Sequence, residues 1–342
     1  MPKRIYCTLF LLTCMIFHSS LARCAESSNV TGWQQDLMQG RQMWSQGDYA
    51  GAETVLLRAL KEAEKEGPDD PKVAVTLNSL GAVYQDLGRF GEAEQLYRSS
   101  IRALEKVPGK QGRNGLELAA SLNNLADLWM ETGNYRKAEP LLRRCLSIRE
   151  ETLGPDTPEV AMTLNNIGSL YRLQRKWEDA EPPLKEALSI FQRKLGAQDL
   201  RVAEVMSNLG RLAQEAGKLK EALSYSEGVL KIIEKSSIAA PAFIAKALNN
   251  HGVLYMVMGS PREAAPYLEK ALEVEEAALG PEHPNVAGIL TNYAAVLRKL
   301  KRNDEAKRLE KRAKTILARN SQSSFMGQSV DVSELRAEAA KH

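Results

Sequence analysis

The stretch Leu164-Asn165-Asn166-Ile167-Gly168-Ser169-Leu170-Tyr171 recurs along this 342-residue chain in copies that retain only some of its residues. An apolar residue followed by alanine stands a few residues before each copy and marks its position. These markers are Val73, Leu118, Val160, Val202, Ile244 and Val286, at intervals of 45, 42, 42, 42 and 42 residues. A fixed period of roughly 20 to 50 residues is the signature of a repeat architecture, in which each unit covers the apolar faces of its neighbours only.

Each unit has the pattern of two amphipathic helices. Apolar residues recur at steps of three and four in 160–173 and again in 177–191, with polar Gln174-Arg175-Lys176 between them. A linker with glycine and proline, such as 153–158, closes the unit, because glycine ends helices and proline is tolerated near their starts. The periodicity therefore predicts stacked helical hairpins.

Small residues recur at two places in each unit. Glycine stands within the first helix at Gly81, Gly168, Gly210 and Gly252, and alanine stands early in the second at Ala93, Ala138, Ala180, Ala222 and Ala264. Glycine inside a helix costs about 1 kcal/mol relative to alanine. We therefore expect a compensating close approach of the two helices at these positions.

These residues carry a resemblance to a known family. Gly168-x-x-Tyr171, followed by Ala180 and Ala187, resembles the tetratricopeptide repeat (TPR). The L-N-N-x-G/A and L-G-P-x-x-P-x-V-A strings resemble its kinesin light chain and nephrocystin variety of about 42 residues. The resemblance implies an all-α, right-handed α-solenoid of stacked antiparallel helix pairs, with a concave groove lined by the first helix of each pair.

The predicted solenoid covers residues 30–319. A divergent unit without the asparagine pair precedes the others, which gives about seven helix pairs. The repeats lie near 30–66, 73–107, 118–153, 160–195, 202–235, 244–279 and 286–319. Residues 320–342 are polar and are expected to form a disordered tail.

Residues 1–25 have the composition of an export signal. Lys3 and Arg4 precede the mostly apolar run 5–17, and small residues follow up to Ala22 and Ala25. We therefore expect a periplasmic or secreted protein.

Two alternatives to a cleaved export signal stay open. Residues 21–24 resemble a lipoprotein box, although Arg23 stands where a small residue is needed, and an uncleaved anchor would be shorter than the ~20 apolar residues that normally span a bilayer.

The charge of the chain disfavours nucleic acid as a partner. The formal net charge is +3, but without Lys3, Arg4 and Arg23 the rest of the chain is neutral. Binding to phosphate backbones needs a net basic footprint. The segment 298–319 is the exception, with ten Lys or Arg residues against three acids. A polar cap for the last repeat explains this segment, and contact with an anionic membrane or an acidic partner is the alternative.

No constellation of residues indicates an active site, a cofactor or a metal ion. His251 and His283 stand alone; His251 occupies a position that is Leu209 or Ile167 in other units, and His283 lies where a helix cap is expected. Cys145 is expected to be a small core residue. The sequence contains no Gly-rich phosphate loop and no HExxH or CxxC motif. We therefore expect a protein that is not an enzyme.

Recurring asparagines are the candidate binding residues. One asparagine stands two positions before the small residue of each first helix, at Asn124, Asn166, Asn208, Asn250 and Asn292; we call these the second asparagines. Asn78, Asn123, Asn165 and Asn249 stand one position earlier and are the first asparagines. Asparagine is unfavourable in the middle of a helix, so its recurrence at one register indicates that these residues have a common role.

Two roles fit these amides. An amide donates and accepts hydrogen bonds, so it can pair with the backbone of an extended peptide without reading its sequence, as asparagines at this register do in the resembling families. Alternatively, the amides bond to the neighbouring unit and order the stack. We favour peptide contact for the second asparagines, with specificity from basic residues on the same face: Arg172, Arg211, Lys246 and Arg298.

The sequence therefore predicts a scaffold that holds extended protein segments in the groove of an exported solenoid. Two other functions stay open. The repeats could mediate self-association or docking to an envelope complex, or the chain could be an accessory subunit of an enzyme system. The partner is expected to be a protein or peptide.

Overall fold

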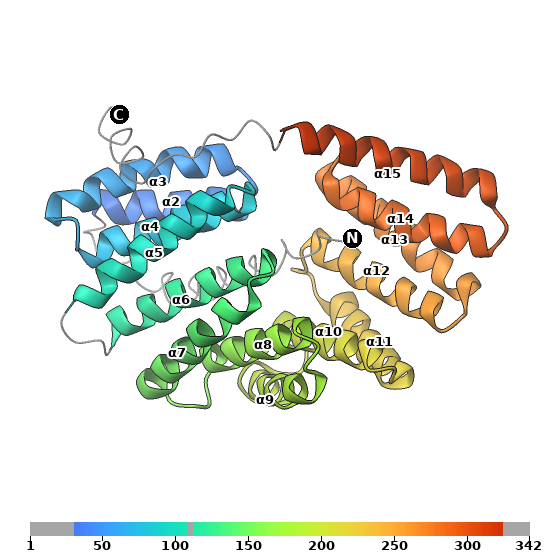
Figure 1. Cartoon of the computed structure of the whole chain (residues 1–342), viewed down its shortest axis with the longest axis horizontal. Coiled ribbons are helices and arrows are strands. Elements are labelled where there is room, and N and C mark those ends of the chain that lie inside the picture. Colours follow the sequence, from blue (N-terminus) through green and yellow to red (C-terminus); the bar gives the residue numbers. More distant parts are fainter. Residues whose placement is uncertain (1–30, 108–111, 324–342) are drawn as a thin grey trace. The chain divides into compact units, whose positions relative to one another are not determined.

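The computed structural model of the protein describes residues 31–107 and 112–323, and its helices are shown in Figure 1. These residues form fourteen α-helices and one short 3₁₀ helix, and they contain no β-strand. The predicted all-α fold is confirmed. The expected signal segment 1–25 and residues 324–342 of the expected tail lie outside the described residues.

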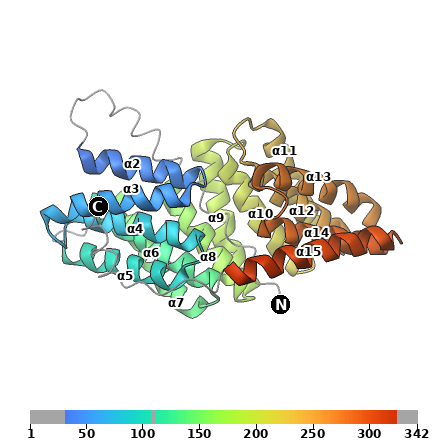
Figure 2. The same ribbon diagram turned by 90° about the horizontal axis from the view of Figure 1, so that it is seen from above.

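The chain divides into two compact units, and the division falls between Gln174 and Arg175. The first unit contains three complete helical hairpins and one further helix, which follow one another in the chain (Figures 1 and 2). Its helices are α2 (Gly32–Ser45), α3 (Tyr49–Ala63), α4 (Pro71–Asp86), α5 (Phe90–Lys106), α6 (Arg113–Glu131), α7 (Tyr135–Leu153) and α8 (Pro158–Leu173).

The second unit contains one helix followed by three hairpins. Its helices are α9 (Trp177–Leu195), α10 (Leu200–Glu215), α11 (Leu219–Lys235), α12 (Pro241–Val257), α13 (Pro261–Leu279), α14 (Pro284–Lys299) and α15 (Asn303–Ser323). In chain order the fourteen helices give the seven predicted pairs. α15 ends at Ser323, four residues beyond the predicted end of the last repeat.

Contacts between hairpins follow the chain order. Within the first unit, α3 packs against α4, α5 against α6 and α7 against α8, and the first helices α2, α4, α6 and α8 also contact one another in sequence. Within the second unit, α9 packs against α10, α11 against α12 and α13 against α14, and α12 contacts α14. Each hairpin thus covers the apolar faces of its neighbours, as expected of a repeat protein.

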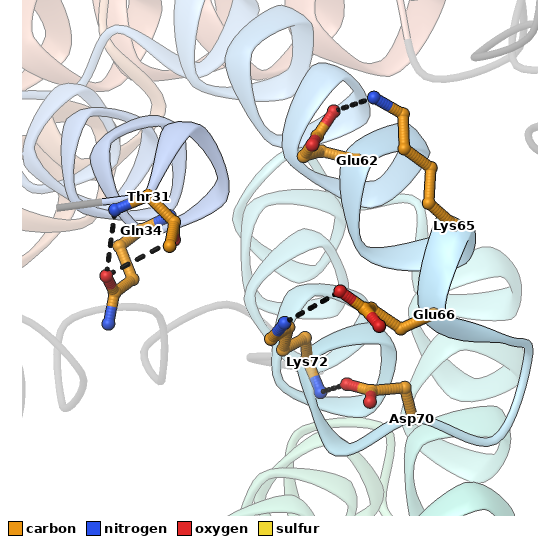
Figure 3. A network of polar contacts seen from close by, with 7 residues as sticks. All are labelled: Thr31, Gln34, Glu62, Lys65, Glu66, Asp70 and Lys72. Carbon is orange, nitrogen blue, oxygen red and sulfur yellow. Dashed lines mark hydrogen bonds and ion pairs between the residues drawn. The ribbon is translucent and has the colours of Figure 1, made fainter. Parts of the chain in front are cut away.

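Local sequence signals fix where the helices begin. Thr31 and Gln34 form a capping box at the start of α2, and the Asp70 carboxylate accepts the Lys72 backbone N–H at 2.7 Å at the start of α4 (Figure 3). Proline occupies the first residue of α4, α8, α12, α13 and α14, where its missing N–H would have no helical partner.

The turn inside each hairpin requires a left-handed backbone conformation. Gly47, Gly88, Gly133, Gly217 and Gly259 supply it in five hairpins, with φ between 74° and 81°. Arg175 and Lys301 stand at the same register with φ of 61° and 63°. Residues with a side chain rarely adopt this conformation, since the Cβ atom approaches a carbonyl oxygen, so these two turns are strained.

The small residues bring the two helices of a hairpin together, as predicted. A Cβ atom added to Gly252 of α12 would lie 2.7 Å from Leu268 Cγ and 3.2 Å from the Ala264 carbonyl oxygen of α13. At Gly81 it would lie 2.6 Å from Tyr97 Cε1, and at Gly210 it would lie 3.3 Å from Tyr225 Cβ. The loss of helix propensity at these glycines is therefore offset by close packing.

Apolar side chains of both helices fill the space between hairpins, and Cys145 belongs to this core. Its side chain is fully buried, and its sulfur lies 3.6 Å from the Thr163 hydroxyl. The predicted core position of Cys145 is confirmed. Within the described residues, no helix combines the length and apolar character that crossing a bilayer needs.

Candidate binding surface on the first helices

The asparagines lie on the first helices of the hairpins and are mostly withdrawn from solvent. In the first unit, Asn78 lies on α4, Asn123 and Asn124 on α6, and Asn165 and Asn166 on α8, and all five are buried. In the second unit, Asn208 is buried on α10, whereas Asn249 and Asn250 on α12 and Asn292 on α14 are half-buried.

Hydrogen bonds join these amides from one first helix to the next. Asn124 Nδ2 donates to Asn78 Oδ1 at 3.1 Å, Asn166 Nδ2 donates to Asn123 Oδ1 at 2.8 Å, and Asn292 Nδ2 donates to Asn249 Oδ1 at 2.9 Å. In each case a second asparagine donates to the first asparagine of the preceding hairpin. We call this arrangement the amide ladder, and it is the geometry that the stacking role requires.

The amide ladder is interrupted at Asn250. The preceding hairpin has Ser207 where an asparagine acceptor would stand, and the Ser207 hydroxyl donates instead to the Ala203 carbonyl oxygen of its own helix at 2.9 Å. No described residue forms a hydrogen bond with the Asn250 side chain. Its amide therefore keeps both its donor and its acceptor capacity.

The asparagines that donate in the amide ladder also have side-chain oxygens that could accept a further hydrogen bond. Among the described residues, none donates a hydrogen bond to Oδ1 of Asn124, Asn166 or Asn292. These oxygens lie on residues of low exposure, since Asn124 is 6% and Asn166 is 8% exposed. Asn250, which is half-buried like Asn292, is therefore more accessible than Asn124 and Asn166. The peptide-contact role of the five second asparagines stays a prediction.

The basic residues expected to give specificity differ in their surroundings. Arg172 at the end of α8 is buried, at 3% exposure, and Arg211 on α10 and Lys246 on α12 are half-buried. The Arg298 guanidinium forms two hydrogen bonds with the Glu310 carboxylate, at 2.6 and 2.7 Å, which tie α14 to α15. Arg298 is therefore held within its own hairpin.

Apolar side chains accompany Asn250 on the exposed part of α12. Val257 is 52% exposed, whereas Val253 and Met256 are half-buried because they also pack against the core formed with α13 and α14. On α14, which contacts α12, the small residues Gly288 and Ala295 are exposed. The surface near Asn250 thus combines one unused amide with accessible apolar area, which is the composition typical of sites that bind polypeptide.

Other polar links between first helices were not anticipated from the sequence. Trp33 Nε1 donates to the Thr76 hydroxyl, Arg41 Nε donates to the Ser79 hydroxyl, and Trp44 Nε1 donates to the Asp86 carboxylate, at 2.9, 2.9 and 2.7 Å. These bonds join α2 to α4, where the divergent first repeat has no asparagine pair. Ser79 occupies the second-asparagine register, and counting from Val73 would have identified it.

The two described histidines occupy structural positions. His251 is 1% exposed, its Nδ1 lies 2.8 Å from the Ser226 hydroxyl, and its ring meets Tyr255 and Tyr267 edge to face at 4.9 and 4.4 Å. His251 is therefore a core residue, like Leu209 and Ile167 at the same register of other hairpins. Burial lowers its pKa below the usual 6.5, and the charge of Glu227 opposes this shift.

His283 caps a helix, as predicted, because its Nδ1 accepts the Asn285 backbone N–H at 3.3 Å at the start of α14. Burial also lowers the pKa of His283. Within the described ranges, no group of three or more His, Cys, Asp and Glu side chains is placed to hold a metal ion.

Comparison with known proteins defines the class of this chain. The family model described as "tetratricopeptide repeat" matches residues 38–106, 117–193, 177–235 and 243–319, which is more than half of the chain. The protein belongs to the tetratricopeptide repeat family. No curated protein sequence matches it.

Solved structures show the same fold. BtubC (BKLC) from P. vanneervenii is 24% identical with a TM-score of 0.54, over 72% of this chain and 92% of that one. A Rap protein in complex with competence and sporulation factor is 14% identical with a TM-score of 0.65, over 92% and 82%. At these identities the likeness concerns the fold alone.

Proposed function

We propose that this protein is a non-catalytic scaffold that binds extended peptide segments of partner proteins along its first helices. Its TPR fold is consistent with protein–protein interaction, and a Rap protein of similar fold is known in complex with competence and sporulation factor. The observation that carries the proposal is the unused amide of Asn250 beside the apolar residues of α12.

Asn250 suits the backbone of an extended peptide. Its amide can donate to a peptide carbonyl and accept from a peptide N–H at the same time, and this pairing does not depend on the peptide's sequence. Val253, Met256 and Val257 would meet an apolar side chain of the same segment.

The test is a comparison of two asparagines at the same register. Peptides are selected from a random library on the immobilised chain, and their affinities are then measured for Asn250→Ala and Asn292→Ala variants. We expect Asn250→Ala to weaken binding about tenfold, which corresponds to the loss of one or two hydrogen bonds. Asn292→Ala should reduce the affinity less, because the Asn292 amide already donates to Asn249. Equal affinities for the wild type and Asn250→Ala would refute the proposal.

Self-association is the alternative function, and a single measurement separates it from peptide binding. Sedimentation of the purified chain over a range of concentrations should give a constant mass if the first helices bind a different polypeptide and not a second copy of the chain. A mass that rises with concentration and a loss of that rise in the Asn250→Ala variant would favour a scaffold that binds its own copies.

We further propose that the protein acts outside the cytoplasm. The support is the charged start, apolar run and small residues of segment 1–25. N-terminal sequencing of the protein recovered from its native cells should give a first residue between positions 23 and 26. A protein that retains Met1 and fractionates with the cytoplasm would contradict export.

A further inference from the structure

Four of the five arginines between residues 298 and 319 form hydrogen bonds or ion pairs with carboxylates of the described residues; Arg308 is the exception. Arg302 forms two hydrogen bonds with Glu305, at 2.7 and 2.6 Å, in the same way as Arg298 with Glu310. Arg312 and Arg319 of α15 reach Glu276 and Glu282, each at 2.5 Å. The guanidinium groups thus neutralise the acids of α15 and of the preceding hairpin within the protein.

The lysines of the same region have no such partners. Lys299, Lys301, Lys307, Lys311 and Lys314 are exposed, and none forms a hydrogen bond or ion pair with a described residue. Positive charge therefore accumulates here in spite of the neutral composition of the chain. The arginines stabilise the last hairpin, so the lysines are not needed for that purpose.

Three of these lysines share one face of α15. Lys307, Lys311 and Lys314 follow one another at spacings of four and three, which places them along a single helical stripe. Ala306, Ala313 and Ile316 lie on the opposite side and are buried against residues of α14. We call this outward stripe the lysine face. Two acids lie close to it: Asp304, in the first turn of the helix, and Glu310, whose pKa is lowered by its hydrogen bond with Arg298 and further by the charge of Lys314.

We propose that the lysine face docks on an anionic lipid surface. Lysine is a compact, strongly hydrated charge without fixed hydrogen-bond geometry, which suits a diffuse layer of lipid phosphates, whereas a protein carboxylate is better matched by the planar fork of arginine. Next to the lysines the face carries Thr315 and Ala318, without the aromatic anchors that mark protein interfaces. This inference is independent of the proposed peptide binding.

The expected contact is peripheral and electrostatic. The exposed large apolar side chain of α15 is Leu317, at 44% exposure, and one such residue adds little insertion into the bilayer. Each lysine near an anionic surface strengthens partitioning by about fivefold. Binding therefore depends on the whole stripe and weakens as salt screens the charges.

The test is co-sedimentation of the full chain with vesicles made of equal amounts of phosphatidylcholine and phosphatidylglycerol, and with phosphatidylcholine vesicles alone. A triple variant, Lys307→Gln, Lys311→Gln and Lys314→Gln, removes the lysine face while keeping good helix formers. We expect the wild type to prefer the anionic vesicles and the variant to bind them about 100-fold more weakly. Circular dichroism verifies that helicity is unchanged.

A matched control removes the same charge elsewhere. Lys220, Lys231 and Lys235 are exposed on α11, but they share their face with Glu227 and Glu234. Their triple change to Gln should leave vesicle binding within about twofold of the wild type, since the local field there is mixed. Equal losses in both triple variants, or no preference of the wild type for anionic vesicles, would overturn the proposal. Tighter binding of the wild type to polyglutamate than to vesicles would overturn it in favour of an acidic polypeptide.

Discussion

Asn166 and Asn250 occupy the same register of two first helices, yet their amides have different surroundings. Asn166 donates to Asn123 of the preceding hairpin, whereas the hairpin before Asn250 has Ser207 at the register of the acceptor. The difference depends on a residue about 42 positions earlier in the chain. The recurrence of asparagine alone therefore does not distinguish a stacking role from a binding role.

The two asparagines should differ in their effect on stability. Asn166→Ala leaves the buried Asn123 carbonyl oxygen without its donor, and we expect the free energy of unfolding to fall by about 1–3 kcal/mol. Asn250→Ala removes no internal hydrogen bond, and the change should stay within about 0.5 kcal/mol. Urea denaturation followed by circular dichroism measures both. A loss of similar size in Asn250→Ala would mean that this amide also supports the stack.

Lys301 provides a second test at the level of single residues. It holds the left-handed turn conformation that glycine supplies in five other hairpins. Lys301→Gly should raise the free energy of unfolding by about 0.5–1 kcal/mol, because glycine adopts this conformation without strain. The control is Lys307→Gly, within α15, which should lower it by about 1 kcal/mol. A destabilised Lys301→Gly variant would contradict the assigned strain.

The buried His251 makes stability depend on pH. Its folded-state pKa is lowered by burial, so the unfolded chain binds the proton more readily. The stabilisation it provides is present above pH of about 6.5 and is lost as pH falls through and below that value. Thermal unfolding between neutral and mildly acidic pH should show this fall for the wild type.

The variant His251→Leu isolates this contribution, since leucine and isoleucine occupy the same register in other hairpins. The variant should lose less stability than the wild type over the same pH range. The pKa of His283 is also lowered, and this histidine is present in both proteins. It accounts for the dependence of stability on pH that remains in the variant. Identical pH profiles would show that His251 accepts its proton without disturbing Ser226 and the two tyrosines.

At the scale of the helix pair, the close approach of backbones decides the effect of a substitution. Gly252→Ala places a methyl group against Leu268 and the Ala264 carbonyl oxygen, and we expect it to cost about 1–3 kcal/mol of stability. Gly288 lies in α14 with nothing within 4 Å of the added Cβ atom. Gly288→Ala should therefore stabilise the protein by about 0.5–1 kcal/mol. Equal effects of the two changes on the urea midpoint would contradict the packing described.

The helix pairs could be predicted largely from the sequence, because their signals are local. Apolar spacing fixes the helices, glycine and proline fix their ends, and the Gly252 and Ala264 positions imply the contact that the structure contains. The end of α15 at Ser323 is different. Its last turn continues through polar residues that carry no apolar periodicity, so the repeat pattern ends before the helix does.

The partners of polar side chains were less accessible to prediction. Arg298 shares a stripe with other candidate binding residues, but its pairing with Glu310 depends on the position of α15. Arg172 is charged and nevertheless buried. Such contacts join residues of different helices. The repeat period predicts at which positions polar residues recur, but it does not predict which of their atoms form contacts.

At the scale of the whole molecule, the TPR architecture limits how far a disturbance travels. Each hairpin is stabilised by its neighbours, so the stability of a repeat protein is a sum of local terms. The Gly252→Ala variant should show faster amide hydrogen exchange in α12, α13 and the hairpins next to them. Exchange in α2 to α6 should be unchanged. Mass spectrometry of peptic fragments measures both, and a uniform acceleration over the chain would contradict this local coupling.

The central claim is that the interruption of the amide ladder at Ser207 leaves Asn250 available to a bound polypeptide. The direct test is Ser207→Asn, which places at this register the same residue type that accepts from Asn292 at position 249. We predict that this variant gains about 1 kcal/mol of stability and binds library-selected peptides about tenfold more weakly. A variant that gains the stability but binds the peptides as tightly as the wild type would contradict the account.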